Sequence, residues 1–300
     1  MFPYIGGKAH HVKWMDQLFP NDIQRFVEVF GGAGWVSVKS QRVDTSKHRV
    51  YNDFNPLLAN VFECFRLDPE RVLALMDSRS CGNLELYKQY QRELFQDLDW
   101  TTVELGNFEL AVRYLYLQTQ VFAGTPLSAN NVAYFTEQKA NGKYPSKYNT
   151  LKKKLANQEI CNRLKSISRV ENLDCVDLIV KHDSAETFFY VDPPYYKMEF
   201  YYSKDFPREK HQELAETLGN IQGKFALSYY DFDDLRQFYP EDRFYWHRQQ
   251  VYRSAATRSA GKKNYNTHSK GTEILIMNYD PKSYATTKKR LNRYEELFVE

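Results

Sequence analysis

The stretch of sequence best suited to chemistry is an acid that follows a hydrophobic run and precedes two prolines. Thr187 to Val191 are all β-branched or aromatic, which is typical of a buried strand. Asp192 comes next, and Pro193 and Pro194 then end the strand, because proline lacks an N–H and has a fixed φ. The sequence therefore places a carboxylate and a proline carbonyl at the carboxyl end of a strand, where open α/β sheets bind ligands.

These groups suit the attack of an amino group that is conjugated to an aromatic ring. Such a nitrogen is a weak nucleophile, because its lone pair is delocalised into the ring. The Asp192 carboxylate and the Pro193 carbonyl can accept its two N–H groups, and Tyr195 can stack on the ring. The expected contribution is positioning, together with electrostatic stabilisation of the charge that develops on nitrogen. The alternative interpretation is a strand that ends in an ordinary proline turn.

Earlier in the chain, a second pattern predicts the first unit of a Rossmann-like domain. A strand is predicted over residues 25–30, followed by a turn with Gly31, Gly32 and Gly34 and then by a helix. Asp53 ends a second short strand about twenty residues further on, where such folds place the carboxylate that binds ribose hydroxyls. The glycine spacing differs from the full dinucleotide pattern, which disfavours a nicotinamide cofactor.

The alternation of strands and helices is interrupted between residues 66 and 168. Helices are predicted over residues 84–98 and 108–122, and the polar stretch 123–154 is expected to be a loop. Its asparagines and lysines are residue types that contact bases and phosphates, but they are equally typical of a solvated loop. We expect an α/β catalytic domain formed by residues 1–65 and 169–300, with 66–168 as an inserted, mainly helical substrate-recognition domain.

The second half of the chain returns to alternating strands and helices. A third predicted strand ends in Asp174, so Asp53, Asp174 and Asp192 are expected on one rim of a sheet. Two later strands, over 243–247 and 272–279, are expected to pair in antiparallel fashion. The basic loop between these two strands suits contacts with phosphates, although a solvated loop has the same composition.

The bulk composition excludes several classes of protein. The net charge of +3 is mild, so contacts with nucleic acid must come from local clusters of basic residues. The four cysteines are widely scattered, which indicates neither a zinc site nor a disulfide framework but reduced thiols in a cytoplasmic protein. We also expect no secretory signal and no membrane-spanning segment.

Taken in order, these motifs resemble those of the Dam-like, alpha-group DNA adenine-N6 methyltransferases, which use S-adenosylmethionine. The resemblance runs from Tyr4 to the segment that begins at Glu273, and therefore covers nearly the whole chain. Its most specific part is the Asp-Pro-Pro-Tyr motif after an apolar strand. The order of glycine motif, insertion and Asp-Pro-Pro-Tyr motif is the second part.

The resemblance implies roles for particular residues. Asp174 would contact the adenine of the cofactor, with Asp183 as the competing candidate, because Cys175 stands where the family often has phenylalanine. The cofactor would be bound by Tyr4, Gly6, Gly7, Lys8, Phe30, Gly31, Gly32, Gly34, Asp53, Asp174 and Asp192. The catalytic motif would be Asp192, Pro193, Pro194 and Tyr195, and DNA would be contacted by Lys197, Arg253, Arg258, Lys262 and Lys263.

The activity implied is site-specific, direct methyl transfer to an adenine that is flipped out of double-stranded DNA. No metal and no covalent enzyme intermediate would be involved, and the protein would act as a cytoplasmic monomer encoded by a bacterium or a phage. Transfer to cytosine N4 or to RNA adenine stays open, as does an inactive DNA-binding homologue. A protein-glutamine methyltransferase is disfavoured, because such sites usually have asparagine before the two prolines.

Overall fold

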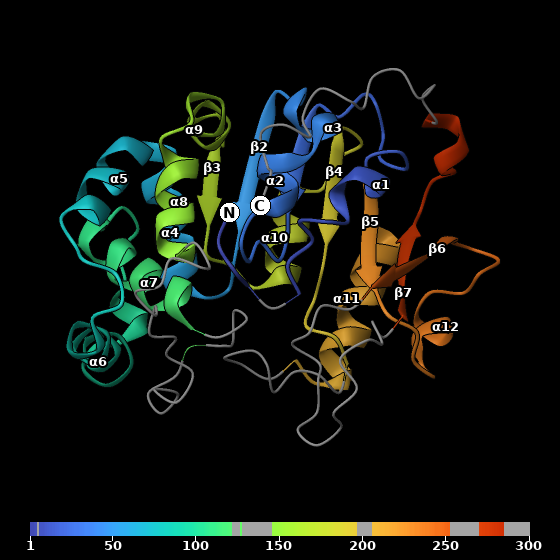
Figure 1. Ribbon diagram of the computed structural model, residues 1–300. Helices are drawn as coiled ribbons and strands as arrows, with labels where there is room; N and C mark the ends of the chain where they lie inside the picture. The colour runs from blue at the N-terminus through green and yellow to red at the C-terminus, as the bar shows by residue number, and fades with distance from the viewer. Residues whose placement is uncertain (5, 122–126, 128–145, 197–205, 253–269, 285–300) are drawn as a thin grey trace.

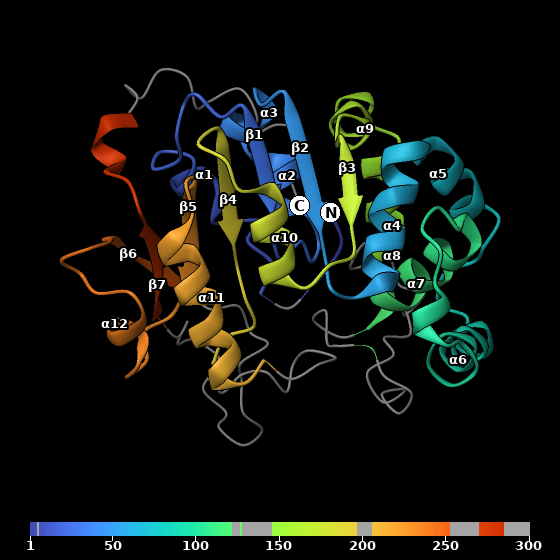
Figure 2. The ribbon, with the colours of Figure 1, turned by 180° about the vertical axis from the view of Figure 1, so that it is seen from behind.

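The computed structural model describes residues 1–4, 6–121, 127, 146–196, 206–252 and 270–284. Within them, one seven-stranded sheet has the order β3-β2-β1-β4-β5-β7-β6 and carries helices on both faces (Figures 1 and 2). The strands are β1 (Arg25–Glu28), β2 (His48–Asn52), β3 (Arg169–Glu171), β4 (Thr187–Val191), β5 (Lys224–Tyr229), β6 (Tyr245–Tyr252) and β7 (Lys270–Met277).

The described helices form two groups, those outside the segment between β2 and β3 and those within it. The former are α1 (Val12–Met15), α2 (Trp35–Lys39), α3 (Gln41–Asp44), α10 (Cys175–His182), α11 (Arg208–Asn220) and α12 (Leu235–Phe238). The latter are α4 (Pro56–Leu67), α5 (Pro69–Asp77), α6 (Leu84–Arg92), α7 (Phe108–Gln120), α8 (Lys147–Leu155) and α9 (Gln158–Lys165). A π-helical turn (Glu93–Asp97) and 3₁₀ turns (Trp100–Thr102 and Pro281–Tyr284) complete the described helical elements.

The strand order confirms the predicted Rossmann-like α/β class. Strands β1 to β5 run parallel, and β7 lies antiparallel to both β5 and β6. From β1 the sheet grows through β2 in one direction, and from β4 it grows through β5 in the other. The junction between β1 and β4 is therefore the topological switch point, where such sheets bind ligands outside the carboxyl ends of the strands.

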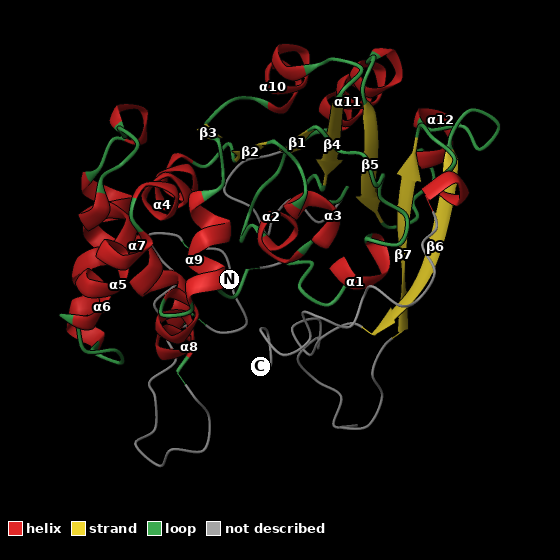
Figure 3. Ribbon diagram, turned by 90° about the horizontal axis from the view of Figure 1, so that it is seen from above, coloured by secondary structure: helices red, strands yellow, loops and turns green. Residues whose placement is uncertain are grey.

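Strand β4 is buried on both faces, as its continuous hydrophobic run predicts. Phe188 and Tyr190 pack in the cluster that includes residues of α1, α2 and α3. Phe189 and Val191 pack in the cluster that includes residues of α10 and α11. Figure 3 shows these two groups of helices on opposite faces of the sheet. The residue after Val191 therefore emerges from the centre of the molecule.

Helices α4 to α9 gather beyond β3, at one end of the sheet (Figure 3). They share a hydrophobic core that also contains Tyr51 of β2 and the N-terminal residues Met1 and Phe2. Asn60, fully buried in α4, links this group to the turn that precedes α7. Its side chain donates to the carbonyl of Asn107 at 2.9 Å and accepts from the N–H groups of Gly106 and Asn107.

The expectation of a loop over 123–154 is wrong for its last part, which forms most of α8. Ser146 caps this helix by accepting a hydrogen bond from the Asn149 N–H. Tyr148, Leu151 and Leu155 are buried along one face of this helix. Their spacing favours a helix, although the polar composition of the segment is typical of a loop. Leu127 packs against the core, and the rest of the polar stretch before Ser146 lies outside the described residues.

Other predicted elements are confirmed. Strand β4 occupies the expected residues, and β6 and β7 form the expected antiparallel pair. Cys64, Cys161 and Cys175 are buried and Cys81 is half-buried, all as free thiols. None of the described helices is both long enough and apolar enough to cross a membrane.

We predict that Asn60→Ala lowers the free energy of unfolding by about 3 kcal/mol, because it removes three hydrogen bonds that each contribute about 1 kcal/mol. Urea denaturation followed by circular dichroism measures the change. Asn162→Ala, at an exposed position of α9, is the matched control and is expected to change stability by less than about 0.5 kcal/mol. Equal losses in the two variants would contradict the structural role of Asn60.

Candidate active site

The glycine turn after β1 bends the chain sharply into α2. Gly32 and Gly34 have φ angles of 51° and 64°, a left-handed conformation that glycine adopts without steric cost. Gly31 lies so close to Tyr51 that a Cβ would stand 2.1 Å from the tyrosine ring. The turn is therefore fixed at the carboxyl ends of β1 and β2.

Asp53 follows β2 and faces this turn. Its carboxylate accepts hydrogen bonds from the backbone N–H groups of Gly32 and Asn55, both at 2.8 Å. Burial raises the pKa of Asp53 to about 6, although the two backbone hydrogen bonds oppose the shift. Carboxylate oxygens have more than one lone pair, so the group can still accept hydrogen bonds from the hydroxyls of a ligand.

Asp192 follows β4 and forms an ion pair with Lys8, whose Nζ lies 2.9 Å from its Oδ1. Burial raises the pKa of Asp192 to about 6, while the positive charge of Lys8 opposes the shift. The Lys8 ammonium is itself only 5% exposed and also lies 3.3 Å from Glu273 of β7. A carboxylate at the end of a central strand is thus balanced by a lysine from the beginning of the chain.

Tyr195 is oriented by the same group of charges. Its hydroxyl accepts a hydrogen bond from Lys8 at 2.7 Å and donates to Glu273 at 2.5 Å. Its ring stacks on Tyr229, with centroids 5.2 Å apart, and is tilted against Tyr230. Tyr229, at the end of β5, and Tyr230, which follows it, therefore fix the plane of this ring.

Asp174 caps the N-terminus of α10, three residues beyond the end of β3. Its Oδ1 accepts from the Val176 N–H at 2.9 Å and pairs with Lys210 of α11 at 2.8 Å. Asp183 stands at the other end of α10, where it accepts from the N–H groups of Gln222 and Gly223. Of the two competing acids, Asp174 is therefore the one placed near the switch point.

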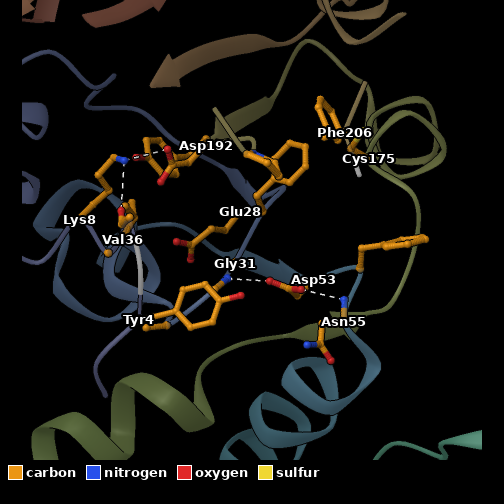
Figure 4. A pocket seen from close by; sticks show the side chains of 18 of the residues that line it. Tyr4, Lys8, Glu28, Gly31, Val36, Asp53, Asn55, Cys175, Asp192 and Phe206 are labelled. Carbon is orange, nitrogen blue, oxygen red and sulfur yellow. Dashed lines mark hydrogen bonds and ion pairs between the residues drawn. The ribbon is translucent and has the colours of Figure 1, made fainter. Parts of the chain in front are cut away.

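A cavity of about 390 Å³ lies along the carboxyl ends of β1, β2 and β4, and its lining includes Lys8, Asp53, Asp174 and Asp192. In Figure 4, Glu28 lies between Asp192 on one side and Asp53 on the other, while Phe206 and Cys175 lie beyond them. The cavity lining includes four acids, glycine backbone and aromatic rings, a combination suited to a ligand with hydroxyls, a flat ring and a positive charge.

Most residues of the predicted site line this cavity. They are Tyr4, Gly6, Gly7, Lys8, Phe30, Gly31, Gly32, Asp53, Asp174, Asp192 and Pro194. Gly34 does not line it: a Cβ at this position would be 2.4 Å from Phe62, so this glycine serves the packing of α2 against α4. Pro193 and Tyr195 do not line it either, although each is next in sequence to a lining residue.

Several lining residues were missed by the sequence analysis. Lys210 and Phe206 come from the start of α11 and the segment before it, far along the chain from the motifs. Phe54, which directly follows Asp53, is 45% exposed, and a large exposed aromatic next to a candidate ribose ligand is a signal that could have been used. Glu28, an acid inside a hydrophobic strand pattern, is another such signal.

Glu28 is buried at the end of β1, and its carboxyl group faces the cavity. The Ser37 hydroxyl and N–H both donate to Glu28 Oε2, the latter at 3.1 Å. Burial raises the pKa of Glu28 to about 8, although the hydrogen bonds from Ser37 oppose the shift. At neutral pH Glu28 is therefore mainly a neutral acid, and a cationic ligand would favour its ionised form.

The predicted DNA contacts fall on segments that lie outside the described residues. This applies to Lys197, Arg253, Arg258, Lys262 and Lys263. The part of the chain that the structure describes contains no group of three or more histidine, cysteine or acidic side chains arranged to hold a metal ion.

The sheet with its switch-point cavity and Asp-Pro-Pro-Tyr motif defines a class of methyl-transferring enzymes, and comparison with known proteins gives the family. The family model of D12 class N6 adenine-specific DNA methyltransferases matches residues 4–255. The chain belongs to this family, and its activity is methylation of adenine N6 in DNA. A relative is the type II methyltransferase M1.LlaDCHI of Lactococcus lactis subsp. cremoris, 24% identical over 294 residues, which cover 92% of this chain and 94% of the relative.

We predict that Glu28 makes stability depend on pH. Its folded-state pKa lies above the unfolded value, so its contribution is fully present below about pH 4.5 and is lost as the pH rises through about 8. Glu28→Gln keeps the shape of the protonated acid and lacks this loss. The melting temperature of the variant minus that of the wild-type protein is therefore expected to rise between pH 5 and pH 8, as measured by thermal melts. A difference that stays flat would contradict the raised pKa.

Proposed function

We propose that the cavity binds S-adenosylmethionine, which supplies a methyl group on a positively charged sulfur. The residues present fit such a molecule. Asp53, held by two backbone N–H groups, suits the ribose hydroxyls, and the Asp174 carboxylate suits an amino group. The Tyr190 hydroxyl is buried against the cavity without a partner in the described residues, and therefore needs one from a ligand.

The distribution of acids supports a cationic methyl donor. Glu28 lies between Asp53 and Asp192 in the cavity, so a molecule that extends from one strand end to the other would pass over it. Tyr4, Gly6 and Gly7 line the same cavity from the N-terminal segment. We propose that this segment covers the bound cofactor and excludes water from it.

The acceptor in this proposal is an adenine that is flipped out of double-stranded DNA. The Asp192 carboxylate would accept one N–H of the amino group and stabilise the charge that develops on nitrogen. Tyr195, whose ring is held by Tyr229 and Tyr230, would offer a stacking surface beside it, worth about 1–3 kcal/mol. The Pro193 carbonyl would accept the second N–H, as the sequence predicts.

The chemical step is direct transfer. The amino nitrogen forms a bond to the methyl carbon while the bond between carbon and sulfur breaks, with its electron pair kept by sulfur. The nitrogen then carries a positive charge and releases a proton. The Asp192 carboxylate is the proposed acceptor, because burial raises its pKa to about 6 and it can pass the proton on to water.

The helical segment 66–168 is the proposed target-recognition domain, and residues 1–65 and 169–300 are the proposed catalytic domain. Helices α5 to α9 contact one another and α4, which continues to Leu67 and thus joins the two parts. The type II relative supports a role as the modification enzyme of a restriction–modification system. We further propose that the protein acts as a cytoplasmic monomer.

The observation that carries the proposal is that Asp192 and Asp53 face one cavity at the switch point. Its test is incubation with radiolabelled S-adenosylmethionine and plasmid DNA, followed by digestion to nucleosides and identification of the labelled base. Label is expected in N6-methyladenine. Label only in cytosine, or only when RNA is supplied, would contradict the proposed acceptor. Cofactor binding without any transfer would point to an inactive DNA-binding protein.

We predict that Asp192→Ala lowers the rate of methyl transfer by at least about 100-fold, the effect of removing a group that stabilises charge in the transition state. DNA binding, measured by electrophoretic mobility shift, is expected to change little. Asp242→Ala, at an exposed position, is the matched control and is expected to keep the wild-type rate. Wild-type turnover in Asp192→Ala would remove this residue from the catalytic role.

A further inference from the structure

The Lys8 ammonium has more oxygen neighbours than it has protons. Its three N–H groups face the Asp192 carboxylate at 2.9 Å, the Tyr195 hydroxyl at 2.7 Å, the Gly6 carbonyl at 3.2 Å and the Glu273 carboxylate at 3.3 Å. Four acceptors compete for three donors, so the ammonium can shift between the two acids by a small rotation.

Glu273 has surroundings that stabilise its carboxylate, which can bind the Lys8 ammonium. The side chain is 9% exposed, and its Oε1 accepts hydrogen bonds from Ser228 at 2.6 Å and Tyr195 at 2.5 Å. Burial alone raises the pKa of Glu273, but the charge of Lys8 and these two hydroxyls outweigh it, so the pKa lies below its usual value. The surroundings of Glu273 therefore favour its ionised form.

Unlike Glu273, Asp192 keeps a pKa above its usual value despite its contact with Lys8. Burial raises the pKa of Asp192 to about 6, the charge of Lys8 lowers it, and the charge of Glu273 raises it. Burial also lowers the pKa of Lys8, yet the two acids outweigh this and keep it above its usual value. The buried group of one cation and two anions thus carries one net negative charge.

The other titratable groups around Asp192 are neutral near pH 7. Burial raises the pKa of Glu28 to about 8 and lowers the pKa of His11 to about 4. Burial also raises the pKa of Tyr190 and of Tyr195 well above the usual value. Among the described residues that face Asp192, Lys8 and Glu273 are therefore the two charged ones.

We propose that Lys8 and Glu273 form a counter-ion switch for Asp192: Lys8 neutralises Asp192 in the free enzyme and moves to Glu273 when the target amino group arrives. The inference rests on the proposed function of the site. The negative charge of Asp192 is then compensated by Lys8 before substrate binds, and becomes free to stabilise the positive charge that develops on the acceptor nitrogen. Lys8 and Glu273 act as positioning residues through Asp192.

The switch makes opposite predictions for the removal of its two charges. In single-turnover methylation of DNA between pH 5 and pH 9, the acidic limb of the wild-type rate profile reports Asp192. Glu273→Gln removes a negative charge and is expected to move this limb to lower pH, whereas Lys8→Met is expected to move it to higher pH. Each shift should be roughly one pH unit or more. The double variant Lys8→Met/Glu273→Gln should return the limb close to the wild-type position.

The rate on the plateau of the profile distinguishes a Lys8 ammonium that moves to Glu273 from one that stays on Asp192 throughout the reaction. Without Glu273 the ammonium stays on Asp192, so the plateau rate of Glu273→Gln is expected to fall roughly 10- to 100-fold, the effect of one charge-assisted hydrogen bond. Ser228→Ala removes a hydrogen bond to the same carboxylate without removing charge, and is expected to leave the acidic limb in place. Glu171→Gln removes another largely buried carboxylate, on β3, and is the control for loss of charge elsewhere.

Limbs that stay in place, or that move in the same direction in both variants, would overturn the switch. If Lys8→Met does not fold, the Glu273→Gln profile and the double variant decide the question. Thermal melts and the dissociation constant for S-adenosylmethionine identify folded variants. Wild-type protein that transfers no methyl group in this assay would instead contradict the proposed function of the site.

Discussion

A buried carboxylate at the end of a central strand is the constraint on which this structure depends. Asp192 emerges from β4, which is packed on both faces, and its side chain is only 16% exposed, so water stabilises its charge poorly there. Lys8 supplies the compensating charge and is held in turn by Glu273 of β7. The N-terminal segment, β4 and β7 must therefore all be in place before the acid is stable, and the strand order brings them together.

The same edge of the sheet brings the proposed cofactor site and the proposed acceptor site together. The switch point between β1 and β4 leaves room outside the strand ends, and the glycine turn lets the backbone approach Asp53. The helical group beyond β3 is fastened to this edge through Met1 and Phe2, which belong to its core. The short N-terminal segment thus contacts both the proposed recognition domain, through Met1 and Phe2, and Asp192, through Lys8.

The sequence predicted those parts of the site that depend on local patterns. The strand before Asp192 and the turn around Gly32 follow from residue types alone, because neighbouring residues determine both. Lys210 and the partner role of Glu273 could not be predicted, since they depend on how α11 and β7 pack against distant strands. Helix α8 was missed for a different reason. Its many charged residues indicated a loop, although three buried residues lie at helical spacing. Gly34 was assigned to ligand binding, but its small size is needed for packing against Phe62.

The position of β7 has a consequence for how the protein is made. It is the last described strand in the chain, yet it is inserted between β5 and β6 and carries Glu273 into the centre of the site. On the ribosome, β4 and Lys8 emerge long before β7 does. The nascent chain therefore holds an unfinished sheet with an exposed edge at β5 and an incompletely compensated acid. A protein with this topology completes its central sheet, and with it the surroundings of Asp192, only after β7 has been synthesised.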